Sequence, residues 1–208
     1  MFPTVESKLF IQGSVGRLEL IASPSPTDTG QRAAVICHPH PQMQGTLHNK
    51  VVTTLAKTCL ALGIPTVRFN YRGVEQSEGQ YGHGQGELDD TLTVLSWLNN
   101  CFPRREFWLA GFSFGGAIAY QATQQFNIKQ LILVAPSVVH FDLTQYPEPI
   151  CPWVVVQGEE DEVVPASDVY AWIQGLSHQP TLIKVPECSH FFHGKLVELK
   201  ERLIEVLL

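Results

Sequence analysis

The feature that most constrains this chain is the pentapeptide at residues 111–115, which has the pattern G-x-S-x-G with Ser113 at its centre. It follows a short apolar run at residues 106–110, typical of a strand, and precedes a run of small, apolar residues suited to a helix. This arrangement predicts a nucleophile elbow, in which a strained backbone exposes the serine hydroxyl at the end of a strand. A glycine-rich turn with an incidental serine is the alternative reading.

Two further residues follow Ser113 in the order that this chemistry requires. Asp161 comes shortly after the apolar run at residues 153–156, and His190 comes shortly after the run at residues 181–185. The order Ser, Asp, His along the chain is that of α/β-hydrolases and differs from that of chymotrypsin and subtilisin. Because both residues follow predicted strands, we expect all three side chains to meet at the carboxyl edge of one sheet.

Short apolar runs alternate with helix-compatible segments along the whole chain, with no internal repeat. This alternation predicts an α/β fold with a mostly parallel sheet and helices on both faces. The segments between the strands predict helices at residues 47–62, 87–100, 167–176 and 192–208. The expected strands lie at residues 8–12, 17–22, 33–37, 64–69, 106–110, 130–134, 152–156 and 181–185.

The chain resembles the α/β-hydrolase superfamily over nearly its whole length, and more narrowly the small lidless serine hydrolases related to dienelactone hydrolase. Two positions differ from such relatives, since Gln44 and Glu75 stand where glycine is frequent. The resemblance implies an α/β-hydrolase fold, and residues 135–151 are too short an interval for the helical cap that many members carry, so we expect an open pocket. The matching segments are residues 38–41, 49–52, 68–74, 111–115, 158–165 and 189–195.

The motifs assign a catalytic role to each of the three residues. Ser113 is the expected nucleophile, and His190 is the expected general base that later protonates the leaving group. Asp161 is expected to orient the imidazole, and the Gly-x-x-Asp-x-Val-x-Pro arrangement of the relatives favours it. The alternatives are a buried, structural His190 and, for the acid, the neighbouring glutamates at positions 159, 160 and 162.

An oxyanion hole needs two donors aimed at the oxygen that becomes negative. The backbone amide of Phe114, directly after the nucleophile, is the first candidate. The second should come from the loop after residues 33–37, where two prolines leave His40 as the only amide donor between them. The amides of Gln42 and Met43 are the fallbacks, and a purely structural role for residues 38–41 is the alternative.

Composition sets the remaining expectations. A length of 208 residues suits one domain over residues 1–208, and the net charge of −6 argues against nucleic acid or an anionic membrane as partner. The five cysteines show no metal-binding or disulfide spacing, and the N-terminus has no signal-peptide pattern, so we expect a cytoplasmic protein. The motifs imply no metal and no organic cofactor, and the oligomeric state is left open.

These observations predict a serine hydrolase that cleaves small, short-acyl esters through an acyl-enzyme on Ser113. Three alternatives keep the same catalytic residues: a thioesterase, an amidase or peptidase, and an acyltransferase. A noncatalytic α/β-hydrolase scaffold is the fourth. The expected partner is a small-molecule ester.

Overall fold

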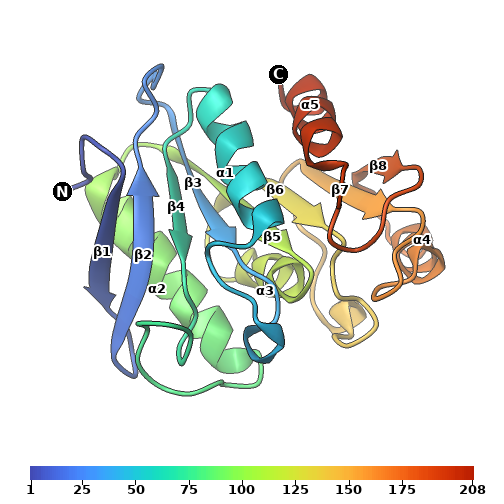
Figure 1. The fold of residues 1–208 in the computed structure, drawn as a ribbon, viewed down its shortest axis with the longest axis horizontal. Coiled ribbons are helices and arrows are strands. Elements are labelled where there is room, and N and C mark those ends of the chain that lie inside the picture. The colour runs from blue at the N-terminus through green and yellow to red at the C-terminus, as the bar shows by residue number, and fades with distance from the viewer.

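The computed structural model describes residues 1–208 and contains one sheet of eight strands (Figure 1). The strand order across the sheet is β1-β2-β4-β3-β5-β6-β7-β8. Strands β1 and β2 pair antiparallel, as do β2 and β4, and every other neighbouring pair is parallel. The strands are β1 (Ser7–Gln12), β2 (Arg17–Ser23), β3 (Arg32–Cys37), β4 (Thr66–Phe69), β5 (Glu106–Phe112), β6 (Ile128–Val134), β7 (Trp153–Gly158) and β8 (Thr181–Val185).

Five α-helices cover the two faces of this sheet. Buried residues of α2, α3 and α4 pack with one face, whereas those of α1 and α5 pack with the other. Figure 1 shows α1 in cyan and α5 in red on one side, with the green α2 across the opposite side. The prediction of a mostly parallel α/β sheet with helices on both faces is confirmed. The helices are α1 (Lys50–Ala61), α2 (Gln85–Cys101), α3 (Phe114–Ala122), α4 (Ala166–Gln174) and α5 (Leu196–Leu207).

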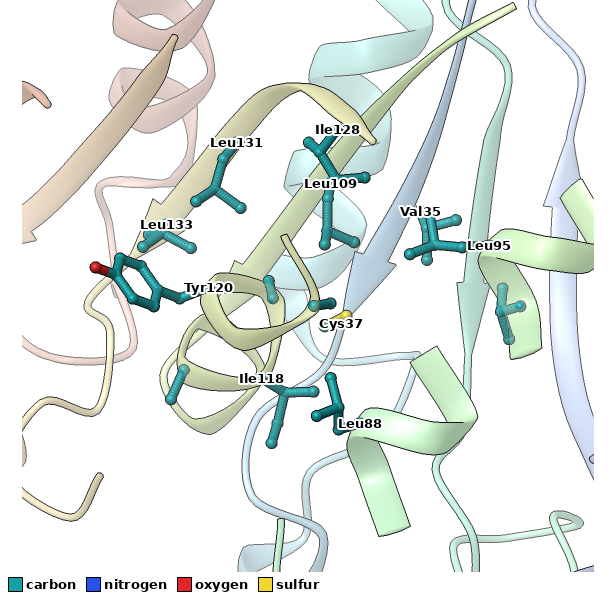
Figure 2. Close-up of a cluster of buried hydrophobic side chains, with 14 of the residues drawn as sticks. Val35, Cys37, Leu88, Leu95, Leu109, Ile118, Tyr120, Ile128, Leu131 and Leu133 are labelled. Carbon is teal, nitrogen blue, oxygen red and sulfur yellow. The ribbon is translucent and has the colours of Figure 1, made fainter. Parts of the chain in front are cut away.

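The larger of the two cores lies between the sheet and α2, α3 and α4. Figure 2 shows Leu88 and Leu95 of α2 and Ile118 of α3 beside Val35 and Leu109 of the central strands. All five side chains are buried, and burying such a side chain stabilises the fold by about 1.5–3 kcal/mol. The central strands are apolar on both faces because helices cover both, which explains why they read as continuous apolar runs.

Two helices begin later than the sequence predicts. The first was expected from residue 47 but starts at Lys50, because Asn49 caps it by accepting hydrogen bonds from the amides of Val51 and Val52. The last was expected from residue 192 but starts at Leu196. Phe192 has φ +54° and Gly194 has φ +72°, left-handed conformations that a continuing helix excludes.

No helical cap lies over the carboxyl edge of the sheet. The interval between β6 and β7 holds only the short 3₁₀ helix η2 (Leu143–Gln145). The expected lidless architecture is therefore confirmed. No helix of the chain is both long and apolar enough to cross a bilayer.

Candidate functional site

The carboxyl edge of the sheet brings together the three residues that the motifs single out. Ser113 follows β5 directly, Asp161 lies three residues beyond β7, and His190 lies in the loop after β8. All three are largely buried, with 8%, 7% and 2% of their surface exposed, respectively. Parallel strands place their carboxyl ends at one edge, so residues far apart in sequence meet there.

Ser113 occupies a strained turn between β5 and α3. Its φ of +55° and ψ of −118° lie in a region that residues with a side chain rarely adopt. The two flanking glycines permit the turn, because a Cβ on Gly111 would collide with the carbonyl oxygen of Gly115, and one on Gly115 with that of His38. The strand-to-helix turn expected from the pentapeptide is therefore present, and it carries the serine at its apex.

Asp161 and His190 are joined by a hydrogen bond of 2.8 Å between Oδ2 and Nδ1. The other carboxylate oxygen of Asp161 accepts from the amides of Val163 and Val164 at 2.9 and 2.7 Å. Burial by itself would raise the pKa of Asp161, but the hydrogen bonds from His190 and the two amides outweigh it and lower the pKa. The carboxylate therefore stays ionised and holds a hydrogen on Nδ1, which leaves the lone pair on Nε2.

Gln157, the penultimate residue of β7, is a further member of this network that the sequence did not reveal. It is fully buried, and its Nε2 lies 3.1 Å from Oδ2 of Asp161, 3.2 Å from the Gly158 carbonyl and 3.1 Å from the Val164 carbonyl. Three acceptors around this atom identify it as the amide nitrogen. A polar residue at the end of an otherwise apolar strand was the only available signal.

The glutamates considered as alternatives to Asp161 make no hydrogen bond with the His190 ring. Glu162 instead accepts a hydrogen bond from the backbone amide of His190 at 3.1 Å, and so ties the two loops together. Glu159 and Glu160 make no side-chain hydrogen bond and are exposed.

Ser113 and His190 meet at this edge of the sheet, as expected, and border the same cavity, but no hydrogen bond joins them in this structure. Oγ of Ser113 and Nε2 of His190 make no hydrogen bond, and neither atom is fully buried. Both atoms therefore retain access to the cavity. Contacts of this kind are often long without substrate and shorten when it binds.

The loop after β3 leaves the amide of His40 uncommitted. His40 donates no hydrogen bond from its backbone N–H, whereas the amides of Gln42 and Met43 are taken up by the Nδ1 and carbonyl oxygen of His40. The amide of Phe114 is the first of α3, where N–H groups have no intrahelical acceptor. Of the donors considered from sequence, those of Phe114 and His40 are therefore the two that are free.

His38 fixes this loop from beneath. Its Nδ1 lies 2.6 Å from the carbonyl oxygen of Pro39, and its Nε2 accepts from the amide of Tyr71 at 3.1 Å. Complete burial lowers the pKa of His38 to about 3, so the ring is neutral, with its hydrogen on Nδ1. The neutral imidazole links the ends of β3 and β4 and orients the peptide that precedes His40.

The cavity has a volume of about 730 Å³, within the range of small-molecule sites. None of its lining residues is an aspartate, glutamate, lysine or arginine, and nowhere in the chain do three or more His, Cys, Asp or Glu side chains gather as a metal site would require. The lining residues are Pro39, His40, Gln42, Met43, Gln44, Gly45, Asn49, Tyr81, Ser113, Phe114, Ser137, His140, Phe141, Val163, His190 and Phe191.

The two positions at which glycine is frequent in relatives share one backbone feature. Gln44 has φ +60° and Glu75 has φ +47°, both in the left-handed region that favours glycine. Glu75 also accepts a hydrogen bond from Asn70 at 2.9 Å, a contact that glycine could not make. Both side chains therefore lie on a backbone conformation that glycine adopts most readily.

Comparison with known proteins agrees with this geometry. Residues 20–150, more than half of the chain, match the sequence pattern of the X-Pro dipeptidyl-peptidase (S15) family. The chain belongs to this family, within the α/β-hydrolase superfamily. It is also 31% identical to an uncharacterized protein of Rickettsia prowazekii, over 97% of this chain and 88% of the relative.

Two solved structures are more similar still. An α/β serine hydrolase homologue from Coxiella burnetii is 41% identical, with a TM-score of 0.96 and full coverage of both chains. An α/β serine hydrolase without a lid, from Xanthomonas campestris, is 40% identical with a TM-score of 0.93, over 98% of this chain and 94% of that one. Both agree with a lidless serine hydrolase of the α/β type.

Proposed function

We propose that this α/β serine hydrolase is a carboxylesterase that cleaves small esters with Ser113, His190 and Asp161 as its catalytic triad. The observation that carries the proposal is the 2.8 Å contact between Asp161 and His190, together with a strained Ser113 on the wall of the same cavity. The oriented imidazole has its free nitrogen available to the serine, as nucleophilic catalysis requires.

The first half of the proposed reaction forms the acyl-enzyme. Oγ of Ser113 bonds to the ester carbonyl carbon while its proton passes to Nε2 of His190. The carbonyl oxygen becomes negative and accepts hydrogen bonds from the amides of Phe114 and His40, whose freedom from other acceptors supports this role. The bond to the leaving oxygen then breaks, and His190 returns the proton to it.

The second half restores the enzyme. Water, deprotonated by His190, bonds to the acyl carbon, and the bond between that carbon and Oγ of Ser113 breaks as the proton passes back to the serine. Asp161 stays ionised throughout and stabilises the imidazolium.

The open cavity favours short acyl groups and a small-molecule partner. Three apolar residues at its rim, Met43, Val163 and Phe191, are 80%, 42% and 43% exposed, so little apolar surface encloses a long chain. A cytoplasmic location is part of the proposal, since all five cysteines are free thiols, as expected in a reducing compartment.

A dipeptidyl-peptidase activity is the second candidate, because the family match includes it. Such an enzyme would bind the free amino terminus of its substrate, and a carboxylate is the group that would pair with this ammonium and select for it. The absence of aspartate and glutamate from the cavity lining favours the ester substrate.

Labelling with a fluorophosphonate tests the proposal directly. We expect one phosphonyl group per chain, on Ser113 by peptide mapping, with turnover of p-nitrophenyl acetate and none of an X-Pro p-nitroanilide. Turnover of the anilide would favour the peptidase. A folded protein that neither reacts with the probe nor cleaves either compound would indicate a noncatalytic scaffold.

A further inference from the structure

The cavity wall carries a hydroxyl group that the proposed reaction does not use. Tyr81 lies in the loop between β4 and α2, is half-buried, and lines the same cavity as Ser113. Its Oη is 3.2 Å from Nε2 of His40, and the centroids of the two rings are 5.1 Å apart. The direction of this hydrogen bond decides what the hydroxyl can offer to a substrate.

The hydrogen bonds around the imidazole of His40 fix that direction. The amide of Gln42 donates to Nδ1 of His40 at 3.2 Å, so Nδ1 must carry a lone pair. Burial lowers the pKa of His40, opposed by Glu87 and assisted by His140, so the ring is neutral and its hydrogen is on Nε2. That N–H donates to the oxygen of Tyr81.

The hydrogen of the Tyr81 hydroxyl is therefore left without an acceptor in the protein. The contact with His40 is the only hydrogen bond that the hydroxyl makes. Burial, and secondarily the charge of Glu87, raise the pKa of Tyr81, so the hydroxyl keeps its proton. A ligand that fills the cavity displaces water, and a donor then left unpaired costs about 1–3 kcal/mol.

The position of Tyr81 shows which part of an ester it would meet. His190 must stand beside the leaving oxygen to protonate it, and its ring packs against Phe191, with centroids 5.1 Å apart. Tyr81 packs instead against His40 and, at 6.3 Å, against Phe114, the two residues whose amides face the carbonyl oxygen. If the leaving group stands on the His190 side, the carbonyl oxygen and the acyl group are left for the side of Tyr81.

We propose, on the basis of the proposed esterase function, that Tyr81 determines specificity by donating a hydrogen bond to an oxygen in the acyl group. The preferred substrates are then esters of short oxygenated acids, such as alkoxy, hydroxy or oxo acids, rather than of plain alkanoic acids. The recognised oxygen is neutral, because no lysine or arginine lines the cavity to accompany a carboxylate.

Two p-nitrophenyl esters of matched size test this inference. Methoxyacetate and butyrate have the same number of non-hydrogen atoms and differ in one ether oxygen. We expect Tyr81→Phe to lower kcat/KM about fivefold for methoxyacetate and less than about twofold for butyrate. Because each ester is compared between the wild type and Tyr81→Phe, its intrinsic reactivity cancels. Tyr146→Phe, which removes the hydroxyl of an exposed tyrosine outside the cavity, should leave kcat/KM for both esters unchanged.

Each other outcome has a distinct meaning. Equal losses for both esters would show that Tyr81 only supports His40 or the common carbonyl, and would overturn the inference, as would no change for either. Butyrate lacks the extra oxygen, so its hydrolysis by the unmodified enzyme reports on the esterase function alone. If neither ester is cleaved, the proposed function itself fails. Thermal unfolding of both variants checks that the fold is retained.

Discussion

The site has an acid half, with Asp161, Gln157 and His190, and a serine half, with Ser113, Phe114, His40 and Tyr81. The two halves differ in how many of their polar groups already have partners. In the acid half, the carboxylate of Asp161 accepts hydrogen bonds from the amides of Val163 and Val164, from Gln157 and from His190. Both oxygens of this carboxylate have partners without any ligand, so its geometry is fixed by the fold, and among the fully buried side-chain atoms of this half only Oε1 of Gln157 lacks a partner.

In the serine half, the same kinds of groups are left open. The hydroxyl of Ser113, the amides of Phe114 and His40, and the hydroxyl hydrogen of Tyr81 have no acceptor in the protein. The backbone at Ser113 is also strained. We therefore expect changes in the acid half to reduce both stability and activity, and changes in the serine half to reduce activity alone.

The largest expected effect is that of Ser113→Ala. Activity on p-nitrophenyl acetate should fall to background, a loss on the order of 10³–10⁶-fold, because the nucleophile is gone. The free energy of unfolding in urea should change by less than about 0.5 kcal/mol, since the hydroxyl makes no hydrogen bond. Ser137→Ala, on the same cavity wall, should keep most of the activity. Wild-type turnover by Ser113→Ala would show that Ser113 is not the nucleophile.

Asp161→Asn should reduce both the esterase activity and the free energy of unfolding. It therefore tests the expected difference between the two halves of the site directly. We expect kcat to fall about 10³–10⁴-fold, because the amide favours the wrong imidazole tautomer. Unfolding should become easier by about 1–3 kcal/mol, because an NH₂ group would face the donors of Gln157 and His190. Asp168→Asn, on the exposed first turn of α4, is the matched control.

The pH dependence of stability in Asp161→Asn checks whether the carboxylate of Asp161 is ionised in the folded protein. The pKa of Asp161 is lowered in the folded state, so its contribution to stability is complete above the ordinary carboxyl pKa and is lost as pH falls through the folded value. The stability difference between wild type and Asp161→Asn should therefore shrink below about pH 4. A difference that stays constant from neutral to acidic pH would argue against an ionised, hydrogen-bonded carboxylate.

Gln157→Met should also reduce both stability and kcat, but by less than Asp161→Asn. It removes one donor from Asp161 and leaves the Val164 carbonyl without that partner, so we expect a loss of about 1–2 kcal/mol in stability. We expect kcat to fall about tenfold with KM unchanged, because Gln157 does not border the cavity. Gln130→Met, near the start of β6, controls for the loss of an amide. A change confined to KM would contradict a positioning role.

The fold and the three central residues were accessible from sequence for a specific physical reason. The elbow needs glycine at positions 111 and 115, and alternating strands and helices place the loops of Asp161 and His190 at one edge. Strand order was not accessible, because β4 lies between β2 and β3 through pairings between distant segments. The catalytic roles themselves remain predictions.

The rest of the site depends on contacts that no local pattern encodes. Gln157 reads as one polar residue in an apolar strand, and only the three acceptors around its amide reveal its position in the network. The choice of His40 over Gln42 and Met43 as the free donor depends on the 3₁₀ turn at Pro41–Met43, which uses the amides of the other two. Tyr81 lies in a glycine-rich loop without periodicity, so its approach to His40 could not be read from spacing.

The smallest expected effects are those of acyl length on kcat/KM. They test how open the cavity is beside Ser113. A methylene buried in an apolar enclosure is worth about 0.8 kcal/mol, or about fourfold in kcat/KM. Here Met43, Val163 and Phe191 are exposed at the rim, and residues 135–151 form no cap, so this gain should end after a few carbons. We expect kcat/KM in the p-nitrophenyl series to peak among the short acyl groups.

The dependence of kcat/KM on acyl length shows whether the cavity of one chain is open, or whether apolar surface from a groove or a second chain encloses the substrate. The parameter to compare is kcat/KM, because uniform binding of a longer chain lowers KM without raising kcat. A value that climbs steadily from acetate to decanoate would mean that apolar surface encloses the whole chain. Since the rim of one chain is exposed, a groove or a second chain would have to supply that surface, and a dependence of kcat/KM on protein concentration would distinguish the two. In that case the serine half would be completed by a partner as well as by the substrate.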